Sequence, residues 1–231
     1  MKKQTIILLL AIISGMVTSQ ASAIIGTVRA EGKPEASADA LCGKYDSRQF
    51  KFVERVNYAE MHDFVVYIVG KLPGQTLPTN ETAVVETRRR VTQKGAMFTP
   101  HVLPVVVGTT VEWPNNDDIL HNVFSMSEVK NFDLGLYKSP AKSVRFDAPG
   151  RVDVFCSIHS RMNCVVLVLE NPYFAAANEK GAYRIPNVPP GKYQLKAWHE
   201  RMPSQTREIV VPDAGDLKMD FVLGIKNLPA L

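Results

Sequence analysis

Four residues of the kinds that bind soft metal ions lie in two short segments of this chain. Cys156, His159 and Met162 form a C-x2-H-x2-M pattern, and His121 lies upstream in the segment W-x-N-x-D-x3-H-N. A thiolate, two imidazoles and a thioether suit copper, because this set of ligands is acceptable to both Cu(I) and Cu(II). The pattern therefore predicts a mononuclear copper site that carries single electrons.

Two other interpretations fit the same residues. In the first, Cys156 is half of a disulfide and the histidines are structural. In the second, a zinc ion binds Cys156, His159, His121 and Cys164. Structural zinc favours two or more thiolates on tight turns, whereas Cys164 begins an apolar run. Met162 and the pattern around His121 favour copper over both.

The rest of the chain is expected to form strands that position these residues. Residues 192–197 and 217–223 alternate between apolar and polar side chains, which is typical of strands with one buried face. Residues 105–107 and 165–169 are continuously apolar and predict more deeply buried strands. The expected fold class is therefore all-β. Residues 36–63 are more polar and are expected to hold a short helix or a long loop.

The segments around the four residues resemble the cupredoxin family. Residues 98–100 (F-T-P), 107–113 (V-G-T-T-V-E-W) and 121–123 (H-N-V) are similar to the family's pattern, and the short spacing from His159 to Met162 is similar to amicyanin. The resemblance implies a Greek-key β-sandwich over residues 80–170. It also implies a single type 1 copper that cycles between Cu(I) and Cu(II). The implied ligands are His121, Cys156, His159 and Met162, with Asn122 and Ser157 hydrogen-bonded around them.

Residues 171–225 resemble a second and smaller β-sandwich. Residues 181–195 are similar to the transthyretin-like sandwich of the carboxypeptidase regulatory-like family, whose opening resembles residues 25–34 and 64–68. We therefore expect this sandwich to be split, with residues 24–75 (including the insertion at 36–63) as its first part. Insertion of one domain into a loop of another is well tolerated. In the alternative, residues 24–70 extend the copper domain.

The first 23 residues have the features of an export signal. Lys2 and Lys3 precede a short apolar run, and residues 21–23 form an A-x-A cleavage site. The mature chain is expected to begin at Ile24, to be periplasmic or secreted, and to have no integral membrane segment. The formal net charge is only +4, which gives no indication of binding to nucleic acid.

The chain has three cysteines, an odd number for an exported protein. If Cys156 binds metal, Cys42 and Cys164 remain, and a disulfide between them fits the oxidising compartment. Two separate buried thiols are the alternative.

An electron carrier is the expected function, and no catalytic residues are expected. The chain has five histidines, too few for a multicopper oxidase, and no C-x-x-C-H haem motif. The expected partner is a transient redox protein, such as a cytochrome or a dehydrogenase. The whole chain also resembles exported plastocyanin-like proteins labelled methylamine-utilisation proteins. The alternatives are a copper-binding or delivery protein, and an interaction module whose metal site is structural.

Several other polar residues permit more than one interpretation. His101 is expected to pack at a strand edge, with a further ligand or a proton-coupled switch as alternatives. Asp117 and Asp118 are expected to be turn residues. In the alternative, they shape the potential of the metal site, because both lie shortly before His121 in the sequence. The basic run at 88–90 is expected to be a solvated surface rather than a dock for an acidic partner.

Overall fold

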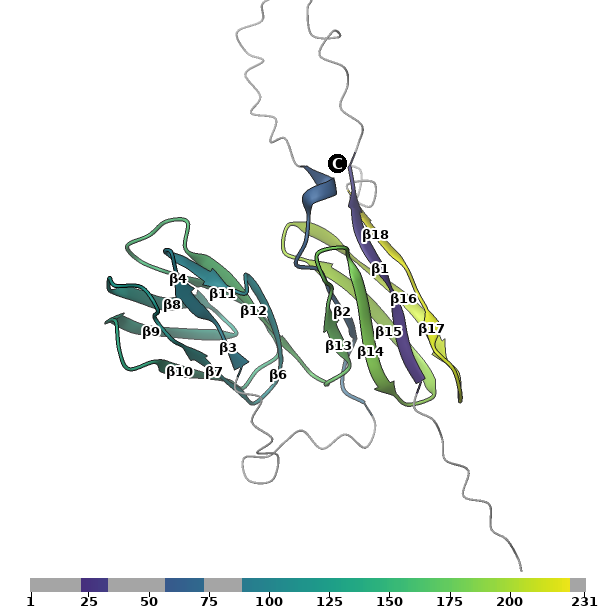
Figure 1. Cartoon of the computed structure of the whole chain (residues 1–231). Helices are drawn as coiled ribbons and strands as arrows, with labels where there is room; N and C mark the ends of the chain where they lie inside the picture. Colours follow the sequence, from purple (N-terminus) through teal and green to yellow (C-terminus); the bar gives the residue numbers. More distant parts are fainter. Residues whose placement is uncertain (1–21, 33–56, 73–88, 225–231) are drawn as a thin grey trace, which may run out of the picture.

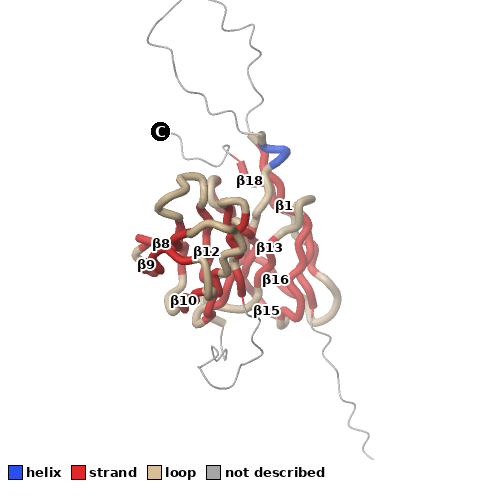
Figure 2. Tube along the Cα trace, turned by 60° about the vertical axis from the view of Figure 1, so that its left-hand side comes forward, coloured by secondary structure: helices blue, strands red, loops and turns tan. Residues whose placement is uncertain are grey.

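The computed structural model describes residues 22–32, 57–72 and 89–224, and over these it is all-β, as predicted. The strands form two β-sandwiches that lie side by side (Figure 1). A turned view shows that strands make up nearly all the regular structure in both (Figure 2). The single helical turn of the described residues is η2 (Tyr58–Glu60), which lies in the segment expected to hold a short helix or loop.

The first sandwich, called here the metal-site sandwich, contains two sheets and a hairpin. Its larger sheet has the order β6 (Val102–Val106), β12 (Asn163–Leu169), β11 (Gly150–Phe155), β8 (His121–Ser127) and β9 (Lys130–Tyr137). Its smaller sheet has the order β10 (Lys142–Phe146), β7 (Thr109–Trp113) and β3 (Arg89–Arg90). Strand β4 (Thr92–Lys94) pairs with β5 (Met97–Thr99). The buried core between these elements includes Trp113, Phe146 and Val154.

The second sandwich is built from strands on both sides of the metal-site sandwich in the chain. One sheet has the order β14 (Ala182–Val188), β1 (Ser22–Glu31) and β17 (Leu217–Lys218), with β18 (Phe221–Gly224) also paired to β1. The other has the order β13 (Phe174–Ala176), β2 (Val65–Ile68), β15 (Gly191–His199) and β16 (Met202–Val211). Strands β1 and β2 therefore share sheets with strands that follow residue 170.

A glycine allows the turn before β14 to lie against β1. Gly181 has φ of +76°, a backbone conformation that favours glycine. A Cβ atom at this position would lie 2.1 Å from the carbonyl oxygen of Val28. The close approach lets Val28 N donate a hydrogen bond of 2.8 Å to Gly181 O.

Strand β1 begins before the predicted mature N-terminus at Ile24. Ser22 donates from its hydroxyl to Pro212 O over 2.9 Å, and Ala23 N donates to a carboxylate oxygen of Asp216 over 3.1 Å. Cleavage after Ala23 would remove both hydrogen bonds. Within the described parts of the chain, none of the helical structure is long and apolar enough to cross a membrane.

Strand β12 is buried on both faces, which accounts for its unbroken apolar sequence. Cys164, Val166 and Val168 face the core of the metal-site sandwich. Val165 and Leu167 face the opposite way and pack into a junction cluster with residues of the second sandwich. Successive side chains of a strand point to opposite faces, so a strand between two cores needs apolar residues at every position. This junction cluster consists of Val65, Val102, Val165, Leu167 and Leu169, with Tyr67, Phe174 and Trp198 against it.

Candidate metal centre

The candidate ligands converge because three neighbouring strands meet at one end of the larger sheet. Strand β8 begins at His121, and it lies beside β11 through the pairing of Phe124 with Phe155. Strands β11 and β12 form an antiparallel pair closed by the loop of residues 156–162. That loop contains the other three candidate ligands, so the sheet brings His121 beside it.

Three ligand atoms lie close enough together to share one ion. Nδ1 of His121 is 3.2 Å from Nδ1 of His159, and Nδ1 of His159 is 3.8 Å from Sγ of Cys156. The candidate atoms of His121, Cys156 and His159 all lie within 4.8 Å of one another. These separations suit an ion with bonds of about 2.0–2.3 Å to nitrogen and sulfur. The donor set therefore fits the copper that its chemistry predicts.

The loop is closed by backbone hydrogen bonds that hold Met162 beside the cysteine. Cys156 N donates to Met162 O over 3.0 Å, and Met162 N donates to His159 O over 3.0 Å. The side chain of Met162 is only 1% exposed and lies in the same core cluster as Cys156. The thioether thus lies in a dry environment on the core side of the loop.

Asp117 takes part in the site, although its sequence position favours a simple turn role. One carboxylate oxygen lies 2.8 Å from Nε2 of His121, which is completely buried. An ionised carboxylate only accepts, so Nε2 of His121 carries the proton and Nδ1 presents its lone pair toward the other ligands. The sequence signal for this contact is that Asp117 lies four residues before His121. The same position is equally typical of an aspartate that only forms a turn.

Asp117 also keeps its turn role. Its carboxylate accepts from Gly95 N over 2.7 Å and from Ala96 N over 2.9 Å, in the turn between β4 and β5. The bond from Ala96, followed by those from His121 and Gly95, lowers the pKa of Asp117 to about 2. The carboxylate is therefore ionised at any pH at which the protein is expected to work.

The two residues expected around the ligands contact each other. Ser157 N donates to the side-chain oxygen of Asn122 over 3.3 Å, and the Asn122 amide donates to Asp133 over 2.6 Å. Because Asn122 follows His121 and Ser157 follows Cys156, these bonds tie β8 to the start of the loop. These bonds therefore hold His121 and Cys156 in fixed positions relative to each other.

One side of the site is open and apolar. His159 is half-buried, in contrast to the completely buried His121. Four aliphatic side chains close to ligands in sequence or strand pairing are exposed: Leu120 and Ile158 are next to His121 and His159, Ile119 precedes Leu120, and Leu136 pairs with Asn122, each being 50–54% exposed. We call these four residues the apolar rim. An exposed apolar patch beside a half-exposed ligand would be typical of an interaction site.

The predicted disulfide between Cys42 and Cys164 stays a prediction, because one of its two residues lies outside the described part of the chain. Cys164 carries a free thiol, and Cys42 lies outside the described residues. The Cys164 side chain faces the core of the metal-site sandwich, and this burial raises the pKa of its thiol well above the ordinary value.

The remaining polar residues of interest have ordinary structural contacts. His199 is buried against the ring of Phe64, and its Nδ1 accepts from Arg201 N over 3.1 Å. In the basic run, Arg90 pairs with Glu112 at 3.0 Å, whereas residue 88 lies outside the described residues.

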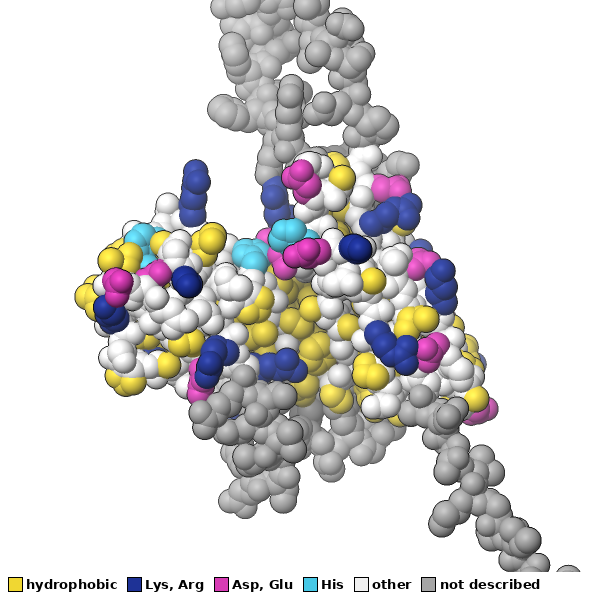
Figure 3. Space-filling model, in the orientation of Figure 1, with side chains coloured by type: hydrophobic (Ala, Val, Ile, Leu, Met, Phe, Trp, Pro, Cys, Tyr) yellow, Lys and Arg dark blue, Asp and Glu magenta, His cyan; other side chains and the backbone are white. Residues whose placement is uncertain are grey.

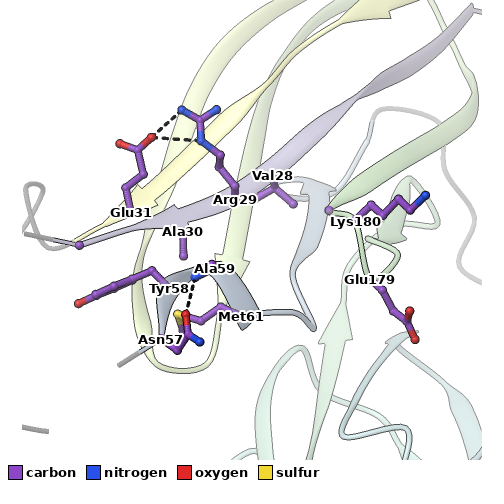
Figure 4. Close-up of a pocket in the computed structure, with 12 residues that line it drawn as sticks. Val28, Arg29, Ala30, Glu31, Asn57, Tyr58, Ala59, Met61, Glu179 and Lys180 are labelled. Carbon is purple, nitrogen blue, oxygen red and sulfur yellow. Dashed lines mark hydrogen bonds and ion pairs between the residues drawn. The ribbon is translucent and has the colours of Figure 1, made fainter. Parts of the chain in front are cut away.

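A hollow on the second sandwich lies well away from these ligands. It is formed by the end of β1, the turn η2 and the turn before β14 (Figure 4). The residues that line it include Tyr58, Met61 and Lys180 but none of the candidate ligands. It adjoins residues 33–56, which are outside the described part of the chain, so it is not interpreted as a site.

The solved structures similar to this chain include copper proteins. A purple cupredoxin from Nitrosopumilus maritimus shares 25% identity, covers 35% of this chain and 98% of its own, and has a TM-score of 0.32. A Cu(I) amicyanin variant shares 27% identity over 37% of this chain and 86% of its own, with a TM-score of 0.34. A Cu-containing nitrite reductase from Thermus scotoductus SA-01 shares 26% identity over 42% of this chain, with a TM-score of 0.36, but only 26% of the reductase is covered. These are local resemblances.

Sequence comparison gives a match of a different kind. A family model described as polysaccharide lyase family 4, domain II, matches residues 165–217, which run from β12 to β17. This is less than half of the chain, and it is not the carboxypeptidase regulatory-like family that residues 181–195 resemble. No curated protein matches the sequence.

Proposed function

We propose that this chain is an exported blue copper protein that carries single electrons through one type 1 copper. The ligands are His121, Cys156, His159 and Met162. The observation that supports this most strongly is the convergence of two imidazole nitrogens and one thiolate sulfur beside a buried thioether. Copper bound by these residues supplies a one-electron couple between Cu(I) and Cu(II).

The chain's own residues favour rapid electron transfer because they hold the ligands still. Asp117 keeps His121 in one tautomer and one orientation. The bonds from Asn122 to Ser157 and between Cys156 and Met162 restrain the loop. A site that is held in one geometry before and after the electron arrives needs little rearrangement, so the barrier is low.

Burial argues for an electron carrier over a copper delivery protein. His121, Cys156 and Met162 are each 6% exposed or less. A donor that hands copper to another protein must let the incoming ligands reach the ion. Here only His159 reaches the surface, which is enough for an electron to leave but obstructs exchange of the ion.

The partner is proposed to be a redox protein that docks on the apolar rim. Transient redox contacts are small, and an apolar surface can be released quickly because it requires few specific bonds. Ile158 of the rim directly precedes His159 in sequence, so a partner that contacts Ile158 approaches the ligand that is most exposed. We also propose that residues 1–23 are an export signal, so that both proteins would work in the periplasm or outside the cell.

Titration of the purified protein with Cu(II), followed by visible absorption, tests the proposed function. We expect an intense blue or green colour from the bond between copper and thiolate. Cys156→Ala should abolish it. Cys164→Ala is the matched control, since this second buried thiol lies in the same core and should leave the colour unchanged. A colourless copper complex in the wild type, or a strong preference for zinc, would refute the proposal.

A further inference from the structure

His101 connects the second sandwich to the residue that follows the loop of residues 156–162, which we call the metal loop. It lies between β5 and β6, and its Nδ1 is 3.2 Å from the carbonyl oxygen of Asn163. Its Nε2 is 2.8 Å from a carboxylate oxygen of Glu200, in the turn between β15 and β16. Asn163 directly follows Met162. One imidazole therefore contacts the first residue of β12, directly after the metal loop, on one side and the second sandwich on the other.

Both contacts require a proton on the imidazole. A carbonyl oxygen only accepts, and an ionised carboxylate only accepts. The hydrogen bond with His101 lowers the pKa of Glu200, so this carboxyl is ionised near neutral pH. A neutral imidazole has one N–H and can donate to only one of the two partners. The geometry is therefore that of an imidazolium, with both ring nitrogens donating.

The surrounding charges are compatible with a positive His101. Besides Glu200, the segment before β2 contributes Asp63, whose charge also raises the pKa of His101. From β11, Arg151 donates to Glu200 O over 3.1 Å and pairs with Asp153 at 2.7 Å. Figure 3 shows histidine and acidic side chains meeting where the two sandwiches join.

Two further groups belong to this cluster, both on the side of the second sandwich. His199 precedes Glu200, and burial lowers the pKa of His199, so it is neutral near pH 7. His62 pairs with Asp63 at 2.6 Å. The hydrogen bond with Glu200 is the main reason that the pKa of His101 is raised, and partial burial opposes it.

We propose that His101 is a proton-dependent latch that holds the end of the metal loop to the second sandwich. When it loses a proton, the remaining proton stays on Nε2, because a hydrogen bond to a carboxylate is stronger than one to a neutral carbonyl. The bond to Asn163 is then lost and the bond to Glu200 is kept. Raising the pH thus removes the side-chain bond to Asn163, whereas the pairing of Asn163 with Phe155 and the backbone bond from Val165 N to His101 O remain and the two sandwiches stay connected.

The latch itself does not depend on copper, but its consequence rests on the proposed function. If Met162 is the axial ligand, loss of the side-chain bond to Asn163 removes one restraint on the chain next to the thioether. The reduction potential of a type 1 site depends on its axial ligand. We therefore expect the potential to change with pH around the His101 midpoint, and this change to be absent in His101→Gln.

Nitrogen-15 NMR of the histidine rings tests the latch in the full mature chain, both metal-free and loaded with Cu(I). We expect both nitrogens of His101 to be protonated at low pH, with a midpoint above the ordinary value of 6.5. Above the midpoint we expect the Nε2–H tautomer. Glu200→Gln should move the midpoint to lower pH, whereas Glu208→Gln, an exposed change near the far end of the β15–β16 hairpin, should leave it unchanged.

Three results would overturn the latch. They are a wild-type midpoint at or below 6.5, a neutral form protonated at Nδ1, and a midpoint that Glu200→Gln does not lower. The metal-free titration separates this proposal from the proposed function. A protein that gives no copper–thiolate colour but shows the expected titration keeps the latch and loses the electron carrier. The reverse combination keeps the carrier and loses the latch.

Discussion

The carboxylate of Asp117 lies 2.8 Å from Nε2 of His121, on the far side of the ring from the other ligands. A carboxylate in this position makes the imidazole a stronger donor to a metal and fixes its orientation. It also couples the ligand to the β4–β5 turn through Gly95 and Ala96. The environment of His121 is thus both negatively charged and rigid.

Asp117→Asn should weaken copper binding and raise the reduction potential. Removing the charge makes His121 a poorer donor, which disfavours Cu(II) more than Cu(I). Loss of a partner of this kind typically costs about 10- to 100-fold in metal affinity. Competition titration gives the affinity and potentiometry gives the potential. Asp118→Asn is the control, because Asp118 is exposed and pairs only with Lys138 among the described contacts. Equal potentials in the two variants would contradict the assignment of Asp117.

Copper should stabilise the fold, and its removal should lower the melting temperature. A ligand that binds only the folded state adds about 4 kcal/mol when its concentration is about 1,000 times its dissociation constant. Thermal unfolding with and without Cu(II) measures this difference. Cys156→Ala should lose most of the increase, whereas Cys164→Ala should keep it despite a lower starting stability. An equal increase in both variants would mean that copper binds elsewhere.

Leu167→Ala should destabilise the protein by about 2–4 kcal/mol, because it leaves a cavity in the junction cluster. Urea unfolding measures the change. Val210→Ala is the comparison, since this apolar residue is 62% exposed and its truncation should cost less than about 0.5 kcal/mol. A small effect of Leu167→Ala would show that the sandwiches do not depend on each other for stability.

The positive charge on His101 should stabilise the protein through Glu200 only in a limited pH window, although the neutral Nε2–H still donates to Glu200 at higher pH. Because the pKa of His101 is raised in the folded state, its contribution is complete below the ordinary pKa and is lost as the pH rises through the folded pKa. The pKa of Glu200 is lowered, so its contribution is lost as the pH falls through that lower value. The free energy of unfolding should therefore decrease on the alkaline side in the wild type. In His101→Gln this part of the pH dependence should disappear, and an unchanged profile would be evidence against the contact.

The local features of this protein could be predicted from consecutive residues. The C-x2-H-x2-M pattern identifies Cys156, His159 and Met162 as neighbours because all three belong to one short loop. The alternation of apolar and polar residues predicts the strands, because successive side chains point to opposite faces. The continuous apolar run at 165–169 correctly predicts a deeply buried strand.

Only the tertiary structure identifies the contacts between distant segments. The structure places Cys164 in the core of the metal-site sandwich, a position that the sequence does not give, because sequence carries no distance between two cysteines. The pairing of His101 with Glu200 joins residues that are almost a hundred positions apart. Strand β12 is apolar on its second face because a second sandwich covers it there. Residue types and their spacing determine which metal the candidate ligands can bind. Sheet pairing and packing decide which charges surround those ligands, because the charged residues come from elements far apart in the chain.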